Sequence, residues 1–165
     1  LGLCLGMQIM VIEYSRNVLH LLDANSSEFD EKSNNLVIDY LPGQIKLKET
    51  GASMRLGNYP CIIKKDSKVF NFYQKEEIKE RHRHRYEVNN LFKERLKKEG
   101  LLPVGTSPDG NLVEIMEVAN HPFMIGSQFH PEFLSRPDRP HPLFHGFVSS
   151  VNETVVEGDQ IRLIK

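Results

Sequence analysis

The sequence predicts an α/β domain built on an open, mostly parallel sheet that is flanked by helices. The 165 residues fit one domain, and a hydrophobic content of 39% is enough for a substantial core. Cys4 is flanked by Gly2 and Gly6, and it stands between an apolar start and a helix-like run. This arrangement is typical of a tight strand-to-helix turn. Strand-like and helix-like patterns then mix along the chain, which favours helices layered on a sheet.

The first element after the turn is expected to be a helix. Apolar residues recur between polar ones over residues 7–22, which is an amphipathic helical pattern. Further helices are expected over residues 68–73, 91–99 and 143–151. Gly100 marks the end of the helix over residues 91–99.

The expected strands are short and bounded by turn residues. They cover residues 36–40, 59–65, 81–88, 101–106, 112–118 and 123–129. The turn Ser107-Pro108-Asp109-Gly110 joins two of them as a tight hairpin. Residues 42–57 and 131–142 are expected to be loops, and the first of these is expected to be the least ordered part of the chain.

The overall composition argues against several kinds of partner. The formal net charge of −1 gives no reason to expect nucleic acid or an anionic membrane. No apolar run approaches the length of a membrane span, and no secretory signal is visible. Cys4 and Cys61 are too few for a disulfide framework, so we expect free thiols and a cytoplasmic location.

The beginning of the sequence carries a further expectation. Only three residues, starting with Leu1, precede Cys4. A turn of this kind normally follows at least one complete strand. We therefore expect residues 1–165 to be the C-terminal part of a domain whose upstream strands lie outside this sequence.

Cys4 is a candidate nucleophile. Glycines at Gly2 and Gly6 let the thiol project from a tight turn, and the N-terminus of the following helix favours a thiolate. The alternative is a small core residue, because free cysteine is among the most buried residue types. A catalytic role therefore needs a base nearby.

His130 and Glu132 are the candidate partners of this cysteine. Catalytic groups gather at the carboxyl ends of strands in open α/β sheets, so the fold can bring Cys4 and His130 together. Glu132 then accepts the other imidazole N–H, as the orienting acid of a triad does. Taken singly, a strand-end histidine bonded to backbone and a solvated glutamate are the plainer interpretations.

The basic stretch over residues 79–85 is open to three interpretations. It could be a nucleic-acid patch, a metal site formed by His82 and His84, or a solvated or ion-paired strand. Alternation along a strand puts the two histidines on one face and the arginines on the other. Metal is the weakest of the three, because no cysteine or third histidine lies nearby in the sequence.

Two motifs resemble the class I glutamine amidotransferases, whose catalytic triad is Cys-His-Glu. They are Gly2-Leu3-Cys4-Leu5-Gly6-Met7-Gln8 and Gln128-Phe129-His130-Pro131-Glu132-Phe133. Further segments resemble the glutaminase domains of the CTP synthase family: residues 23–29, 54–57, 80–90 and 133–137. The resemblance implies an amidotransferase fold, with Cys4, His130 and Glu132 as the catalytic residues.

The resemblance also implies how glutamine is held. Arg85 matches the family position that binds the α-carboxylate, a task suited to a bidentate guanidinium. Glu28 matches a position that helps to hold the amino-acid head group. The segment that matches the lining of the glutamine pocket comprises Leu5, Gly6, Met7 and Gln8. The backbone N–H of Leu5 supplies one oxyanion donor.

For the whole enzyme, the resemblance implies hydrolysis of glutamine and delivery of ammonia to a synthetase domain of the same polypeptide. That domain uses ATP and Mg²⁺ to aminate UTP to CTP, a step of pyrimidine nucleotide biosynthesis. GTP is implied as an activator, and the assembly as a homotetramer. No metal or cofactor is expected in this portion. The second oxyanion donor is expected upstream of Leu1, and residues 51–57 match a lid over the glutaminase site.

Two other functions stay open. A γ-glutamyl hydrolase-like cysteine peptidase shares a turn cysteine and a distant histidine, but Glu132 and the basic stretch argue against it. A catalytically silent regulatory module could also retain this fold. The intact set of Cys4, His130 and Glu132 makes the silent module the weaker hypothesis.

Overall fold

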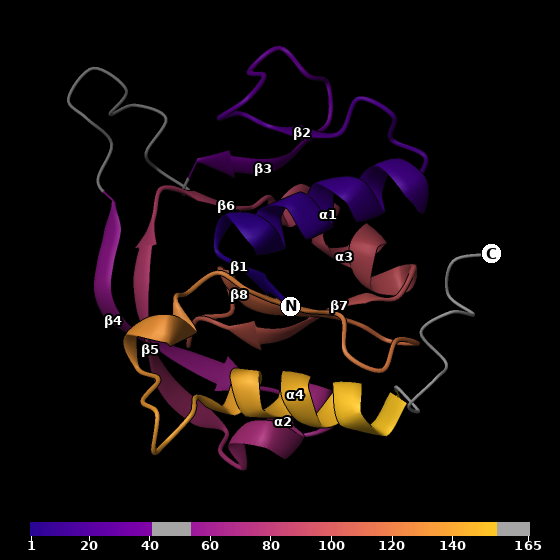
Figure 1. Ribbon diagram of the computed structural model, residues 1–165. Coiled ribbons are helices and arrows are strands. Elements are labelled where there is room, and N and C mark those ends of the chain that lie inside the picture. The colour runs from indigo at the N-terminus through magenta and orange to yellow at the C-terminus, as the bar shows by residue number, and fades with distance from the viewer. Residues whose placement is uncertain (41–53, 155–165) are drawn as a thin grey trace.

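The computed structural model describes residues 1–40 and 54–154, which form two sheets with helices packed on them (Figure 1). In spatial order, the six-stranded sheet contains β1 (Gly2–Leu3), β9 (Ile125–Ser127), β8 (Val113–Val118), β7 (Leu101–Thr106), β4 (Arg55–Ile63) and β5 (Glu77–His84). The three-stranded sheet contains β2 (Asn25–Ser26), β3 (Leu36–Tyr40) and β6 (Tyr86–Val88). The predicted α/β class is confirmed.

The predicted mostly parallel sheet is wrong for the residues that the structure describes. In the larger sheet only β1 and β9 pair in parallel, and the other neighbours are antiparallel. The short connections from β7 to β8 and from β8 to β9 can join only antiparallel neighbours, whereas the antiparallel pairing of β4 with β5 and β7 is not dictated by a short connection. The turn after β7 is closed by a bond from the N–H of Ser107 to the carbonyl of Leu112, and it returns the chain as the predicted hairpin.

Helices cover both faces of the larger sheet (Figure 1). The helices α1 (Leu5–Asn17) and α3 (Asn90–Lys98) pack on one face, whereas α2 (Lys68–Tyr73) and α4 (Pro142–Thr154) lie together beyond the other. Residues of β8 alternate between the two cores, since Met116 belongs to the first and Ile115 to the second. The sheet is therefore buried on both sides.

A close approach holds the N-terminal helix against the sheet. A Cβ at Gly126 would lie 2.6 Å from Cγ of Met7, so only glycine lets α1 approach β9 this closely. Met7 is fully buried as a result. This contact fixes the helix that follows Cys4 relative to the strand that leads to His130.

Most expected elements are present, with shifted ends. The short helix α2 covers the predicted residues 68–73, and Ser67 caps it by accepting the N–H of Phe70. The first helix ends at Asn17 rather than at residue 22, because the chain turns at His20, whose φ is +57°. Leu19 still packs in the core after the helix has ended, which is why the apolar pattern continues.

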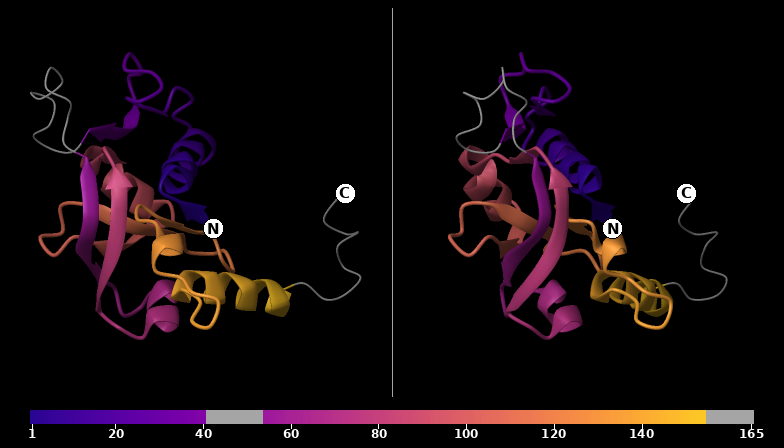
Figure 2. Two further views of the ribbon diagram at one scale, coloured as in Figure 1. Left: turned by 60° about the vertical axis from the view of Figure 1, so that its left-hand side comes forward. Right: turned by 90° about the vertical axis from the view of Figure 1, so that its left-hand side faces the viewer.

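The long β4–β5 pair extends from α2 toward the smaller sheet (Figure 2). β5 begins at Glu77, four residues before the predicted start, and the expected continuous run divides after His84 into β5 and β6. β4 begins at Arg55, within the expected loop over residues 42–57. The rest of that loop, up to residue 53, lies outside the described residues.

Candidate active site

Cys4 occupies a strained turn between β1 and α1. Its φ of 49° and ψ of −104° lie outside the backbone conformations that residues other than glycine prefer, at a cost of about 1–3 kcal/mol. A Cβ at Gly2 would lie 2.7 Å from the backbone of Gly6, so there is no room for a larger residue at this position. At Gly6 an added Cβ meets nothing beyond its own helix, so the expected need for two glycines holds only for the first.

Two hydrogen-bond partners of the Cys4 sulfur lie far from it along the chain. The thiol lies 3.9 Å from the carbonyl oxygen of Arg83, and the side-chain Nε2 of Gln128 lies 3.8 Å from the sulfur. Burial raises the pKa of the Cys4 thiol, against the lowering effects of the Leu5 N–H and the Gln128 amide. The net direction is opposite to the expected thiolate stabilisation, so a base is needed to remove the proton.

His130 and Glu132 form a close pair. The Nδ1 atom of His130 lies 2.6 Å from Oε1 of Glu132, and the Glu132 side chain is 44% exposed. The pair lies at the beginning of a 3₁₀ turn, Pro131–Phe133, that follows β9. This geometry places a ring proton on Nδ1, which donates to the Glu132 carboxylate, and it leaves Nε2 to act on another group.

Strand β5 brings the cysteine and the histidine to one part of the molecule. Arg83 lies beside the sulfur of Cys4 through its carbonyl, and the carbonyl of Arg81 accepts the N–H of His130 at 2.8 Å. Two residues along a strand span about 6.6 Å, so both groups lie along the same short stretch of β5. Among the described residues, no hydrogen bond joins the sulfur directly to His130.

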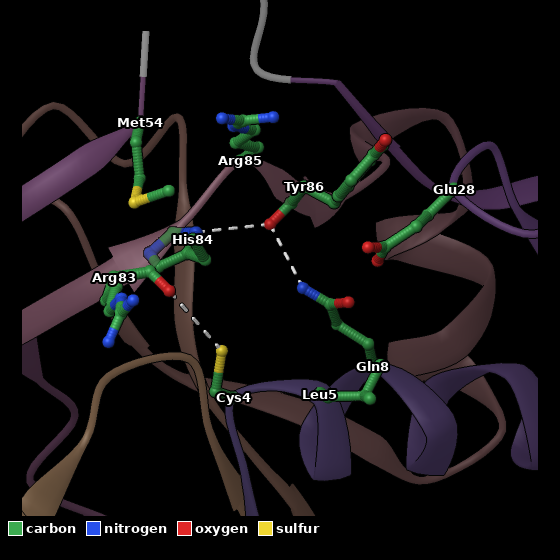
Figure 3. A pocket seen from close by; sticks show the side chains of 9 residues that line it. All are labelled: Cys4, Leu5, Gln8, Glu28, Met54, Arg83, His84, Arg85 and Tyr86. Atoms are coloured by element: carbon green, nitrogen blue, oxygen red, sulfur yellow. Dashed lines mark hydrogen bonds between the residues drawn. The ribbon is translucent and has the colours of Figure 1, made fainter. Parts of the chain in front are cut away.

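A cavity of about 440 Å³ opens beside Cys4 (Figure 3), within the size range of small-ligand sites. It is lined by Cys4, Leu5, Gln8, Glu28, Met54, Arg83, His84, Arg85 and Tyr86. Figure 3 shows Cys4 on one side of this cavity, with Arg85 and Glu28 across from it. The structure therefore places a cation and an anion opposite the thiol.

Two of the expected lining residues lie elsewhere. Met7 is fully buried against Gly126, and Gly6 lines a different, apolar cavity beside Ile9 and Met124. Their neighbours Leu5 and Gln8 do line the cavity beside Cys4. The difference follows from the helix, because successive residues of α1 point about 100° apart around its axis.

The alternation predicted for the basic stretch is confirmed. Ile78, Glu80, His82 and His84 are buried on one face of β5, and the residues between them are exposed. The two histidines are in contact, with Nδ1 of His82 2.8 Å from Nε2 of His84. Burial and the nearby Arg55 lower the pKa of His84 to about 3, so its ring is neutral at physiological pH.

A buried charged cluster behind the cavity could not be found from sequence patterns. The Nη1 atom of Arg55 lies 2.8 Å from Oε1 of Glu114 and 3.2 Å from Oε1 of Glu87. Burial raises the pKa of Glu87 to about 8, and the Glu114 carboxylate adds to this shift. One guanidinium thus faces two carboxyl groups, which favours one of them being protonated. Sequence patterns do not indicate this cluster, because charged residues in strand-like runs usually face solvent.

The described part of the chain offers neither a metal cluster nor a membrane-spanning helix. Residues 1–40 and 54–154 contain no group of three or more His, Cys, Asp or Glu side chains placed to hold a metal ion. The same residues include no helix that is long and apolar enough to cross a membrane.

Comparisons with known proteins agree on one family. The family model described as Glutamine amidotransferase class-I matches residues 1–150. The chain is 54% identical over 160 residues to a CTP synthase from Dehalococcoides mccartyi, covering 97% of this chain and 29% of that protein. It is 59% identical over 150 residues to a CTP synthase from Rubrobacter xylanophilus, covering 91% and 27%. The chain thus spans less than a third of these relatives.

A solved structure agrees with the sequence relatives. The CTPS glutaminase domain of Trypanosoma brucei with bound acivicin superposes with a TM-score of 0.87 at 37% identity. The superposition covers 94% of this chain and 60% of that one. The fold and the sequence therefore point to the same group of proteins.

Proposed function

This chain belongs to the class-I glutamine amidotransferase family, and from that premise we propose that residues 1–165 are the C-terminal part of the glutaminase portion of a CTP synthase. The activity is hydrolysis of the side-chain amide of glutamine, with release of ammonia. The observation that carries this proposal is the position of Cys4, on a strained turn facing a cavity that Glu28 and Arg85 also line.

The first half of the reaction forms a thioester. His130 takes the thiol proton through Nε2, and the sulfur of Cys4 attacks the amide carbon of glutamine. The backbone N–H of Leu5 stabilises the oxyanion that develops on the carbonyl oxygen. His130 then gives the proton to the amide nitrogen, the C–N bond breaks, and ammonia leaves.

The second half frees glutamate. Water attacks the thioester carbon while His130 takes one of its protons. The C–S bond then breaks, and the proton returns to the sulfur of Cys4. Glu132, 2.6 Å from Nδ1, keeps the ring oriented through both halves and stabilises the imidazolium that forms in each.

Charges around the cavity match the amino-acid head group of glutamine. Arg85 binds the α-carboxylate with its planar guanidinium, and Glu28 pairs with the α-ammonium. Leu5, Gly6, Met7 and Gln8 form the segment that carries this side of the site. The side chains of Leu5 and Gln8 contact the ligand, whereas Met7 supports the segment from the core.

The wider activity is proposed from the CTP synthase relatives. Ammonia passes to a synthetase domain that aminates UTP to CTP with ATP and Mg²⁺, with GTP as activator and a homotetramer as the assembly. ATP and Mg²⁺ supply carbonyl activation in that domain, and the steps above use only residues of this chain. Cys4 and Cys61 are free thiols, which is compatible with a cytoplasmic enzyme.

Covalent labelling tests whether the site is active. A glutamine-analogue electrophile should modify Cys4 of the full-length protein, located by peptide mass spectrometry, and excess L-glutamine should slow the modification. Cys4→Ala is the control for other cysteines. Lack of modification at Cys4, or modification that glutamine does not slow, would favour a catalytically silent module.

A further inference from the structure

The buried side-chain amides of Gln8 and Gln128 form a chain of hydrogen bonds that ends at the sulfur of Cys4. Gln128 is 0% exposed and Gln8 is 3% exposed. The Nε2 atom of Gln8 lies 3.3 Å from Oε1 of Gln128, and the Nε2 atom of Gln128 lies 3.8 Å from the sulfur of Cys4. A buried amide is costly unless its polar atoms are bonded, so this chain of contacts specifies how both amides point.

The orientation of the two amides follows from a backbone carbonyl. The carbonyl oxygen of Tyr86 lies 3.2 Å from the Gln8 amide, and because it can only accept, the Gln8 atom that faces it is the NH₂ group. The second N–H of that group reaches Gln128, whose facing atom must then be its oxygen. The other end of the Gln128 amide, the NH₂ group, therefore faces the sulfur of Cys4.

The hydrogen bonds of the sulfur change when Cys4 loses its proton. The thiol S–H is the donor toward the carbonyl of Arg83, and this bond disappears with the proton. The N–H of Gln128 is still able to donate to the sulfur, and hydrogen bonds to an ionised acceptor are stronger than those to a neutral one. The Gln128 amide thus favours the anionic form of the nucleophile over the neutral form.

We propose that Gln128 is a further catalytic residue, which donates its side-chain N–H to the Cys4 thiolate, and that Gln8 is a positioning residue, which holds the Gln128 amide in that orientation. This inference deepens the proposed function and rests on it, since Cys4 is the nucleophile there. Gln128 does not line the cavity beside Cys4, so it acts on the nucleophile and not on the head group of glutamine.

Other groups near the sulfur also affect the pKa of the Cys4 thiol. Burial is the largest influence on the pKa of the Cys4 thiol and raises it, and the carboxylates of Glu132 and Glu28 add to the increase. Arg83 and Arg85 line the cavity from the strand side, and His130 lies beside the same strand. The first-turn N–H of the helix and the Gln128 amide lower the pKa of the thiol. Within the described part of the chain, Gln128 is the one side chain that donates a hydrogen bond to the sulfur.

The pH dependence of Cys4 alkylation measures this effect directly. In the full-length protein, the rate of iodoacetamide modification at Cys4 gives the apparent pKa of the thiol, with Cys4→Ala as the background. Gln128→Met keeps a side chain of similar length without a donor, and it should raise that pKa by about 0.5–1 unit. Gln128→Asn, which keeps the polarity but withdraws the amide from the sulfur, should do the same. Gln8→Met should cause a smaller increase.

The matched control is Ser127→Ala, because Ser127 is equally buried and its hydroxyl bonds to the carbonyl of Phe129 rather than to the sulfur. It should leave the alkylation profile unchanged. In glutamine hydrolysis, Gln128→Met should lower kcat about three- to tenfold with little change in KM. An unchanged Cys4 pKa in both Gln128 variants, or an equal shift in Ser127→Ala, would overturn the inference. The alkylation needs no substrate, so its result is separate from the fate of the proposed function.

Discussion

At the scale of single residues, the sequence alone indicates the groups to which we assign the proposed chemistry. Cys4, His130 and Glu132 stand in short local motifs, and the strain at Cys4 follows from the residues around it. Gln128 stands in one of these motifs, but its contact with the sulfur joins positions 124 residues apart and has no local signal. Tyr86 lines the cavity without such a signal too, whereas Met54 lies in the segment over residues 51–57 that the resemblance matched to a lid over the site.

Arg85→Ala tests the binding of the substrate head group. Loss of a bidentate, charge-assisted hydrogen bond to the α-carboxylate should raise the KM for glutamine about ten- to a hundredfold. The use of free ammonia by the full-length enzyme should change little. Steady-state kinetics with each nitrogen source make the comparison.

A matched control for Arg85 lies on β5, the strand that ends one residue before Arg85. Lys79 is exposed on the corresponding face of β5 but does not line the cavity. Lys79→Ala should leave the KM for glutamine unchanged. A KM that stays the same in Arg85→Ala, or rises equally in Lys79→Ala, would rule out the assigned role of Arg85.

At the scale of elements, prediction succeeded where the signals are local. The helix α2 has a serine cap directly before it, and the β7–β8 hairpin has a four-residue turn between its strands. The start of β5 was missed because Glu80, normally a surface residue, is buried there and accepts a hydrogen bond from the hydroxyl of Tyr73. The mostly parallel sheet was wrong because strand order depends on pairings that no local pattern encodes.

The buried carboxyl of Glu87, on β6, predicts a pH dependence of stability. Its pKa is raised from 4.5 to about 8 in the folded protein, so between these values the folded state holds a proton that the unfolded state has released. Stability attributable to this group therefore falls as pH rises through that window, by at most about 1.4 kcal/mol per pH unit.

Glu87→Gln removes this titration while keeping the size of the side chain. Relative to the unmodified protein, the variant should gain thermal stability as pH rises from 5.5 to 8, measured by the difference in Tm of the full-length protein at each pH. Glu94→Gln is the control, because the side chain of Glu94 is 79% exposed. A Tm difference that does not change with pH would contradict a raised pKa at Glu87.

At the scale of the whole molecule, the sheet explains how distant segments form one site. Cys4 follows β1, His130 follows β9, and these two strands are parallel neighbours, so their carboxyl ends meet at the same edge. This part of the expectation is confirmed even though the rest of the sheet is antiparallel. Across β5, the backbone carbonyls of Arg81 and Arg83 contact both segments, and Arg85 follows at the cavity.

The most direct test of Cys4 as the nucleophile compares the two nitrogen sources in the full-length protein. Cys4→Ala should abolish CTP formation from glutamine, because no thioester can form, and it should leave CTP formation from free ammonia intact. Ser127→Ala, which removes a neighbouring hydroxyl, should retain both activities. Retention of glutamine-dependent CTP formation in Cys4→Ala, or loss of both activities, would contradict the assignment of Cys4 as the nucleophile of a glutaminase.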